Sequence, residues 1–321
     1  ILDIRDLWVQ FHTRDGTVNA VNGVSLALYE QEVLAIVGES GSGKTVTALS
    51  VLGLVPYPGE VTNAGIFFED TLLNTSDEDL MRRVRGKEIS MVFQNAAASL
   101  NPTLSISTQM QESLLAHQNI STEQAWKISV ALLTEMGLSD PHHVMNQYPF
   151  QISGGMAERV MIAMALSSRP KILIADEATS NLDVTMQAEI LDRLRLMRKE
   201  QNASIILITH DMGVVANLAD RVAVMYAGRI MELGTVETVF KSPTHPYTWG
   251  LVQALPRLDR VDSRPRPIMG MPPNLMELPN QCPFLPRCHK ATVECRVSEA
   301  PKLTTVVADH LAACYNPMVQ V

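Results

Sequence analysis

A glycine-rich run of eight residues is the part of the sequence best suited to chemistry. It matches the pattern of a phosphate-binding loop (P-loop) and reads Gly38-Glu39-Ser40-Gly41-Ser42-Gly43-Lys44-Thr45. Its glycines let the backbone curl so that N–H groups point inward and hold a phosphate at a helix N-terminus. We expect the Lys44 ammonium to pair with the β- and γ-phosphates of a nucleotide and the Thr45 hydroxyl to bind Mg²⁺. The alternative is a chance glycine turn before a helix; the sequence favours a nucleoside triphosphatase.

Two adjacent carboxylates, Asp176 and Glu177, follow the apolar stretch Lys171–Ala175. At the carboxyl end of a strand, Asp176 can hold a metal ion through water while Glu177 orients or deprotonates the attacking water. Adjacent acids are also common at helix starts. The pair therefore indicates a catalytic site only because the sequence also contains a P-loop. A further apolar strand, Ile205–Thr209, is followed by the polar residue His210. His210 is either a functional group at the same sheet edge or a capping residue.

The elements that must position these groups follow from hydrophobic periodicity. Short β-branched runs predict buried parallel strands at Val33–Val37, Lys171–Ala175 and Ser204–Thr209. Helical spacing between them, at Val160–Leu166 and Ile190–Met197, predicts a doubly wound α/β core. Alternating residues on both sides of the turn at Asp15-Gly16 predict an antiparallel hairpin layer that ends near Leu28.

Composition narrows the class of protein. The chain has 321 residues, of which 46% are hydrophobic and 19% charged, as expected of a packed protein. Its net charge of −8 disfavours nucleic-acid binding, and we expect no nucleic-acid partner. No apolar run approaches the roughly 18 residues of a membrane helix, and no signal sequence is seen, so we expect a cytosolic chain.

The prolines are unevenly distributed along the chain. Of the 18 prolines, 12 lie after residue 240, Pro265 among them. This distribution predicts a loop-rich tail and a domain boundary near Ser242.

The order and spacing of the functional groups resemble those of an ATP-binding cassette (ABC) ATPase. The resemblance rests on the P-loop, Asp176-Glu177, and three further groups at Gln94, Ser153-Gly154-Gly155 and Leu182-Asp183. It implies an α/β P-loop NTPase core (RecA-like) with an antiparallel β subdomain and an α-helical signature subdomain. It further implies a nucleotide-binding domain over residues 1–240, with the helical subdomain at about 95–165, and a cysteine-containing extension over 241–321.

The resemblance also assigns roles. Ser153-Gly154-Gly155 would be the signature loop, which meets the γ-phosphate bound to a partner subunit's P-loop, so each site needs a dimer. Gln94 would contact Mg²⁺ and the transmembrane partner, so that Thr45, Gln94 and Asp176 form the magnesium site. Asp183 would be the D-loop acid and His210, as a catalytic residue beside Glu177, the switch near the γ-phosphate. Phe11 would stack on adenine, or else be an ordinary core phenylalanine.

The branch of the family is indicated by Thr244-His245-Pro246-Tyr247-Thr248 and by the cysteine-bearing tail. Both resemble importers of dipeptides and oligopeptides, in which two related ATPase subunits drive two membrane permeases fed by an external binding protein. The resemblance thus implies a heterodimer at the cytoplasmic face of the membrane, held there by permeases. The alternatives are an importer of nickel or another small solute, and a soluble ABC ATPase acting in DNA repair or translation.

Four positions depart from the usual family pattern. The signature continues with Ala157-Glu158 where a basic residue and glutamine are common. An acid near a triphosphate would either weaken the sandwiching of the nucleotide or tune asymmetry between the two sites. This keeps open a mainly regulatory subunit whose partner does most of the hydrolysis. Ala178 replaces a usual proline and Asn181 a usual alanine, and neither change has a functional explanation in the sequence.

Four cysteines lie in the last forty residues, at Cys282, Cys288, Cys295 and Cys314. Four thiolates can bind Zn²⁺ or an iron–sulfur cluster, and spacing alone does not identify the metal. A third alternative is that the four cysteines are free thiols with no bound metal. The family resemblance favours a [4Fe–4S] cluster, with Zn²⁺ as the alternative. The neighbouring Arg287, Lys290 and Arg296 are placed to offset the charge of such a cluster.

Overall fold

The computed structural model describes residues 1–62, 65–179, 182–255 and 267–318. Contacts between Cα atoms divide the chain into two compact units. The first unit contains residues 1–28, 33–73 and 208–321, and the second contains 29–32 and 74–207. Pro265 and Asn181, both singled out above, lie outside the described residues.

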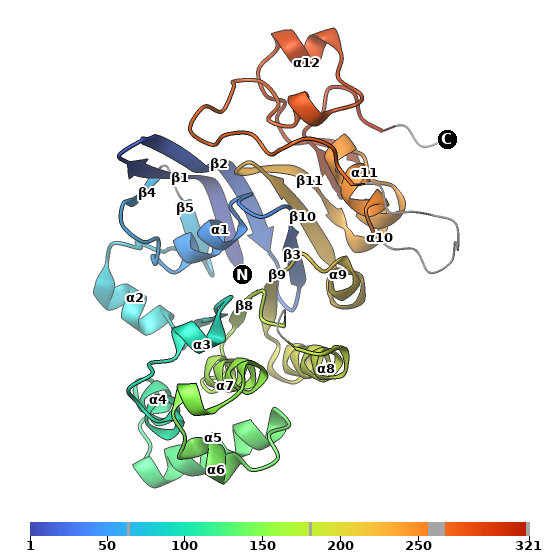
Figure 1. The fold of residues 1–321 in the computed structure, drawn as a ribbon. Helices are drawn as coiled ribbons and strands as arrows, with labels where there is room; N and C mark the ends of the chain where they lie inside the picture. Colours follow the sequence, from blue (N-terminus) through green and yellow to red (C-terminus); the bar gives the residue numbers. More distant parts are fainter. Residues whose placement is uncertain (63–64, 180–181, 256–266, 319–321) are drawn as a thin grey trace. The chain divides into compact units, whose positions relative to one another are not determined.

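An antiparallel sheet opens the first unit. Its strands β1 (Leu2–Thr13) and β2 (Gly16–Leu28) form the predicted hairpin, with Phe11 opposite Val18. This confirms the antiparallel layer, which Figure 1 shows in blue. The sheet has the order β2-β1-β5-β6, and β4 also pairs with β1. The added strands are β4 (Gly59–Thr62), β5 (Gly65–Phe68) and β6 (Thr71–Leu72).

The second sheet of this unit joins strands from both sides of residue 240, in the order β12-β13-β11-β10-β3. Strand β3 pairs in parallel with β10, and the remaining pairs are antiparallel. These strands are β3 (Val33–Val37), β10 (Arg221–Tyr226), β11 (Arg229–Thr235), β12 (Thr304–Val307) and β13 (His310–Ala312). Because β13 pairs with β11, the tail is anchored on the same sheet as the strand that precedes the P-loop.

Helices of the first unit are mostly short. They are α1 (Lys44–Val51), α9 (Met212–Leu218), α10 (Val236–Lys241), α11 (Pro246–Gln253) and α12 (Val293–Val297). Within the described residues from 267 to 303, the regular elements are α12 and one 3₁₀ turn, Leu285–Arg287. The prediction of a loop-rich tail is therefore confirmed, because prolines lack a backbone N–H donor and interrupt regular helices and strands.

The second unit contains parallel strands and most of the longer helices. Its strands have the order β9-β8-β7, and β7 and β8 run parallel. They are β7 (Ile89–Val92), β8 (Ile172–Asp176) and β9 (Ser204–Ile208, whose last residue belongs to the first unit). All five residues of β8 are buried, as its continuous apolar run predicts.

The helices of the second unit are α2 (Glu78–Val84), α3 (Ala96–Ser99), α4 (Ile106–Leu115), α5 (Thr122–Glu135), α6 (Pro141–Met145), α7 (Gly154–Leu166) and α8 (Val184–Gln201). Figure 1 shows α4, α5 and α6 gathered beside α7. Ser121 begins α5 with a capping box that includes Gln124, which satisfies backbone donors at the helix start. Among the residues that the structure describes, no helix is long and apolar enough to cross a membrane.

Candidate nucleotide-binding site

The P-loop lies where the sequence predicts, between β3 and α1 of the first unit, and Gly43 is the residue before the helix. Gly38 has φ +151°, and a Cβ atom there would lie 2.0 Å from the carbonyl oxygen of Met225. Gly43 has φ +102°, and a Cβ atom there would lie 2.5 Å from the carbonyl oxygen of Ala20. The first and last glycines of the loop are therefore required both by backbone conformation and by close packing.

The Lys44 side chain points into the loop that precedes it. Its ammonium donates to the carbonyl oxygens of Gly38 and Glu39, at 2.9 Å each, and to the Ser42 hydroxyl at 3.3 Å. Lys44 is only 7% exposed, while Thr45 beside it is half-buried. A cation held within a ring of backbone groups at the N-terminus of a helix is suited to a phosphate ligand.

Glu39 is the acid of the loop, and its carboxylate is bound by an arginine from the distant tail. The Arg287 guanidinium donates to both Glu39 oxygens, at 2.7 and 3.0 Å. The Glu39 N–H donates to the Tyr247 hydroxyl at 2.9 Å. Arg287 was expected to offset charge at the cysteines, and this expectation is corrected: its short, bidentate partner is the P-loop acid.

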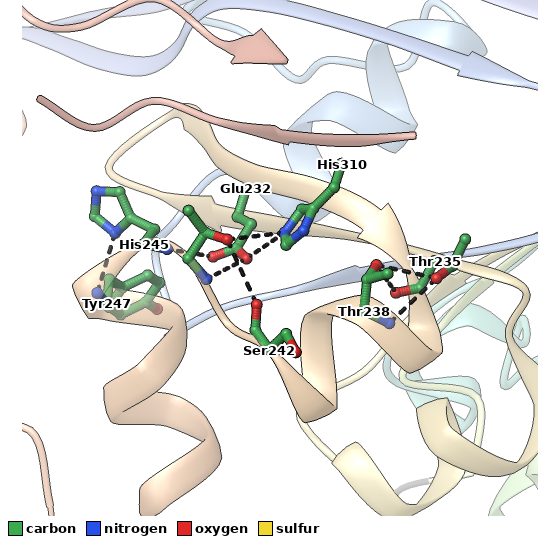
Figure 2. A network of polar contacts seen from close by, with 8 residues as sticks. Glu232, Thr235, Thr238, Ser242, His245, Tyr247 and His310 are labelled. Atoms are coloured by element: carbon green, nitrogen blue, oxygen red, sulfur yellow. Dashed lines mark hydrogen bonds and ion pairs between the residues drawn. The ribbon is translucent and has the colours of Figure 1, made fainter. Parts of the chain in front are cut away.

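Tyr247 owes its position to a buried polar network in which β11 and β13 bind the loop between α10 and α11 (Figure 2). The carboxylate of Glu232 is 0% exposed and accepts hydrogen bonds from the N–H groups of Thr244 and His245 and from His310 Nε2, at 2.7 Å each. Burial lowers the pKa of His245 to about 3, so its neutral ring accepts a hydrogen bond from the Tyr247 N–H at 3.0 Å. The motif at 244–248 thus begins α11 and directs a tyrosine to the P-loop.

An aromatic cluster completes this side of the loop. The rings of Tyr226 and Tyr247 lie 4.6 Å apart between centroids, and Phe284 packs against both at 5.4 and 5.3 Å. All three side chains belong to the buried core of the first unit. Since aromatic pairs at these distances add to the stabilisation from area burial, the tail and the cassette share one core here.

The Glu232 network predicts a large stability effect. In Glu232→Gln, one carboxylate oxygen becomes an NH₂ group that faces a backbone or imidazole donor, so at least one buried hydrogen bond is lost. We expect the free energy of unfolding to fall by about 3 kcal/mol, because a buried, multiply bonded charge is removed. Urea denaturation of the whole chain measures this change. Glu237→Gln is the matched control, since Glu237 pairs with Lys241 on the surface and its replacement should leave the urea midpoint unchanged.

In the second unit, the structure brings Gln94 and Glu177 together. Asp176 is the last residue of β8 and is buried, and Glu177 follows it with φ +49°. Gln94 follows the neighbouring parallel strand β7, and its Nε2 donates to Glu177 Oε2 at 2.9 Å. The ends of two adjacent strands therefore hold one carboxylate in a fixed orientation, as the sheet-edge argument predicts.

The signature loop forms the start of α7. The Ser153 hydroxyl accepts from the Met156 N–H at 3.3 Å, and Ser153 and Gly154 are exposed at the N-terminus of this 13-residue helix. Ala157 and Glu158 are both 1% exposed. Glu158 is therefore buried within the folded chain, whereas the sequence suggested an acid near a partner's triphosphate.

The remaining predicted residues lie at element ends. Asp183 caps α8 by accepting from the Thr185 and Met186 N–H groups, at 3.0 Å each. His210 is exposed after β9, and its neighbour Asp211 caps α9. Phe11, on β1, is half-buried. The P-loop, His210 and Phe11 belong to the first unit, and Gln94, the signature loop, Asp176, Glu177 and Asp183 belong to the second.

The four cysteines are free thiols that border one small pocket of about 20 Å³, the cysteine pocket. Burial is the main cause that raises the pKa of Cys282 to about 11 and that of Cys314 to about 12. In the described part of the chain, no group of three or more His, Cys, Asp or Glu side chains is arranged to hold a metal ion. The expected iron–sulfur site is thus not supported by the arrangement of its ligands.

Comparison with known proteins gives the family. The family described as ABC transporter matches residues 21–180, and the C-terminal region of oligopeptide/dipeptide transporters matches residues 231–295. The oligopeptide transport ATP-binding protein OppD of Haemophilus influenzae is 47% identical over 315 residues, which cover 98% of this chain and 97% of the relative. The chain belongs to the ATP-binding proteins of oligopeptide and dipeptide ABC transporters.

Further relatives agree with this assignment. The dipeptide transport ATP-binding protein DppD of Bacillus subtilis is 48% identical over 296 residues, covering 92% of this chain and 88% of that protein. Among solved structures, the ATP-binding cassette MJ0796, a dimer bound to ADP and Pi, matches with a TM-score of 0.68 and 25% identity. That match covers 74% of this chain and 99% of the other. The predicted α/β cassette fold and ABC-type ATPase activity are therefore confirmed.

Sequence reasoning missed the residues that support the P-loop from the tail. The Arg287–Glu39 pair joins positions 248 residues apart, and the Glu232–His310 pair joins positions 78 apart. One signal was available in the sequence, because an acid within a phosphate-binding loop calls for a nearby cation to offset its charge. No pattern in the sequence selects which of the tail's basic residues fills that role.

Proposed function

We propose that this ABC ATPase subunit hydrolyses ATP at its P-loop to power the uptake of peptides. The observation that carries the proposal is the hydrogen bond from Gln94 to Glu177, because it fixes a carboxylate at the end of β8 next to the buried Asp176. A positioned carboxylate can orient or deprotonate the water that attacks the γ-phosphate.

The proposed roles rest on the family resemblance and on the chemistry of each side chain. Lys44 and the N–H groups of the P-loop bind the β- and γ-phosphates, and Phe11 stacks on the adenine. Thr45, Gln94 and Asp176 are oxygen donors of the type that Mg²⁺ prefers, and the ion would neutralise charge on the phosphates. Glu177 takes the proton of the attacking water, and His210 contacts the γ-phosphate.

The proposed assembly is a dimer of ATPase subunits. The exposed N-terminus of α7 supports it, since Ser153, Gly154 and Gly155 present backbone donors and a helix dipole to an outside phosphate. The MJ0796 cassette is a dimer bound to ADP and Pi. We propose a homologous second ATPase as partner, two permeases that hold the pair at the cytoplasmic face of the membrane, and an external binding protein.

We also propose that residues 1–240 form the nucleotide-binding domain, with a helical subdomain at about 95–165, and that 241–321 form the importer-type extension. The extension match at residues 231–295 and the names of the relatives favour peptides over nickel as cargo. They also favour a transporter over a soluble ABC ATPase.

Purification of the tagged chain from detergent-solubilised membranes tests the assembly. We expect two permeases and a second ATPase in the purified complex, identified by mass spectrometry, and ATP hydrolysis stimulated by peptide-loaded binding protein. Recovery of the chain without membrane proteins would support the soluble alternative. Stimulation by Ni²⁺ in place of peptide would support the nickel importer.

For the cysteine pocket, we propose a bound metal. Its support is the chemistry of four thiols bordering one pocket, which suits soft metal ions. The pocket has room for about one water-sized particle, so binding of a [4Fe–4S] cluster, or of Zn²⁺ as the alternative, requires the four thiols to be arranged differently than in this structure.

Metal analysis of anaerobically purified chain, with Cys288→Ser beside wild type, tests this site. Iron and sulfide in about fourfold excess over protein, lost in the variant, would establish the cluster. One zinc ion per chain would establish the alternative. Absence of both metals from intact protein would leave four free thiols and remove the proposal.

A further inference from the structure

The P-loop of this protein contains an acid, Glu39, beside the position that a triphosphate must occupy. A carboxylate in such a loop repels the ligand, because like charges at short range disfavour binding wherever water screens them poorly. The remaining charged residue of the loop is Lys44, whose ammonium contacts backbone carbonyls and the Ser42 hydroxyl. Binding of a triphosphate therefore requires that the charge of Glu39 be offset from elsewhere.

Arg287 supplies that charge with well-defined geometry. Its side chain is 5% exposed and that of Glu39 is 26% exposed, so the pair is largely shielded from water. Both guanidinium–carboxylate distances, 2.7 and 3.0 Å, are those of a bidentate pair. The hydrogen bond to Glu39 raises the pKa of Arg287 above its usual value, so the guanidinium remains charged at every physiological pH.

The guanidinium is also held in place by its own surroundings. It donates to the carbonyl oxygens of Met269 and Ile268, at 3.1 and 3.3 Å, and to the Tyr226 hydroxyl at 3.2 Å. These contacts come from the tail and from β10, and none of them involves the phosphate-binding groups of the loop. Protein contacts alone thus orient Arg287 toward Glu39.

We propose that Arg287 is a positioning residue for ATP binding: by neutralising Glu39 and holding its carboxylate on the tail side, it makes the acidic P-loop able to accept a triphosphate. The C-terminal extension is then part of the ATP site. This inference rests on the proposed role of the P-loop as that site.

The test measures the Kd for MgATP in the full-length chain with four variants. Arg287→Gln should weaken ATP binding about tenfold, or about 1.4 kcal/mol. Adding Glu39→Gln to this variant should restore the Kd to within about threefold of wild type, because the repelling charge is then gone. Arg287→Lys keeps the charge and should stay close to wild type. Arg82→Gln is the matched control, since Arg82 is exposed on α2 and has no role in the proposed nucleotide or cysteine sites.

Two further measurements separate charge from structure. The deficit of Arg287→Gln should shrink at about 0.5 M salt, whereas kcat at saturating ATP should stay near wild type. A double variant that binds ATP as weakly as Arg287→Gln would overturn the proposal, as would an Arg287→Gln variant with the Kd of the control. If Arg287→Gln does not fold, an Arg287→Lys variant with a tenfold weaker Kd overturns the proposal instead.

Lys44→Ala tests the P-loop as the ATP site separately from the role of Arg287. This variant should abolish ATP binding in the same assay. If it still binds ATP, the P-loop is rejected as the ATP site, and the role of Arg287 is not the point that failed.

Discussion

Replacing Glu177 by Gln is expected to lower ATP turnover at least about 100-fold, the usual contribution of a general base. Binding of ATP should remain, because the change is isosteric. The amide oxygen of the new side chain can still accept the hydrogen bond from Gln94, which the structure shows at 2.9 Å. Turnover is measured as phosphate release by the assembled complex, and binding as the Kd for MgATP.

Glu200→Gln is the control for this prediction. Glu200 is an exposed acid near the end of α8, in the same unit, and its loss removes the same charge at a distance from the strand ends. Turnover by this variant should equal that of wild type. Turnover that survives in Glu177→Gln would remove Glu177 from the proposed role and would favour the regulatory reading, in which the partner subunit does most of the hydrolysis.

The second large effect is expected from Gly38→Ala. The new methyl group would lie 2.0 Å from the carbonyl oxygen of Met225, a backbone atom of β10 that a side-chain rotation does not move. The φ of +151° at this position is also strained for any residue with a Cβ atom. Relieving the clash and the backbone strain requires the P-loop to change shape. We therefore expect the affinity for MgATP to fall about 100-fold or more.

Gly41→Ala separates the clash from the mere loss of a glycine. Gly41 also has a positive φ, +74°, but a Cβ atom there would meet nothing within 4 Å. Its substitution should cost only the backbone strain and weaken ATP binding about tenfold or less. Isothermal titration of both variants makes the comparison. Equal losses at the two positions would show that packing against β10 does not determine the shape of the P-loop.

Features encoded in neighbouring residues were predictable from the sequence. The strand Val33–Val37 and the helix from Lys44 have the predicted starts, because a continuous β-branched run and a glycine-rich turn are local signals. The hairpin of β1 and β2 was likewise predicted from alternation around a short turn. Gln94 and Glu177 follow adjacent parallel strands, so their meeting follows from topology once the strands are known.

Contacts set by tertiary packing were not predictable. Arg287 was assigned by proximity in sequence to the cysteines, yet the fold of the tail turns its guanidinium to the P-loop. Glu158 was placed near a partner's triphosphate by its position in the signature motif, whereas its place in α7 buries its side chain. The clustering of the four cysteines in the tail led to the expectation of one shared metal site; all four border one pocket, but no described group of three or more of them is arranged to hold a metal ion.

The central claim, that this chain powers peptide uptake with ATP, is tested most directly by transport itself. Proteoliposomes containing the purified complex would be given a radiolabelled tripeptide, its binding protein, and MgATP on the side that this chain faces. At an MgATP concentration near the wild-type Kd, we predict ATP-dependent accumulation of the tripeptide with the wild-type chain and almost none when this chain alone contains Gly38→Ala. Accumulation that continues undiminished with the variant, or that occurs for Ni²⁺ and not for peptide, would contradict the account.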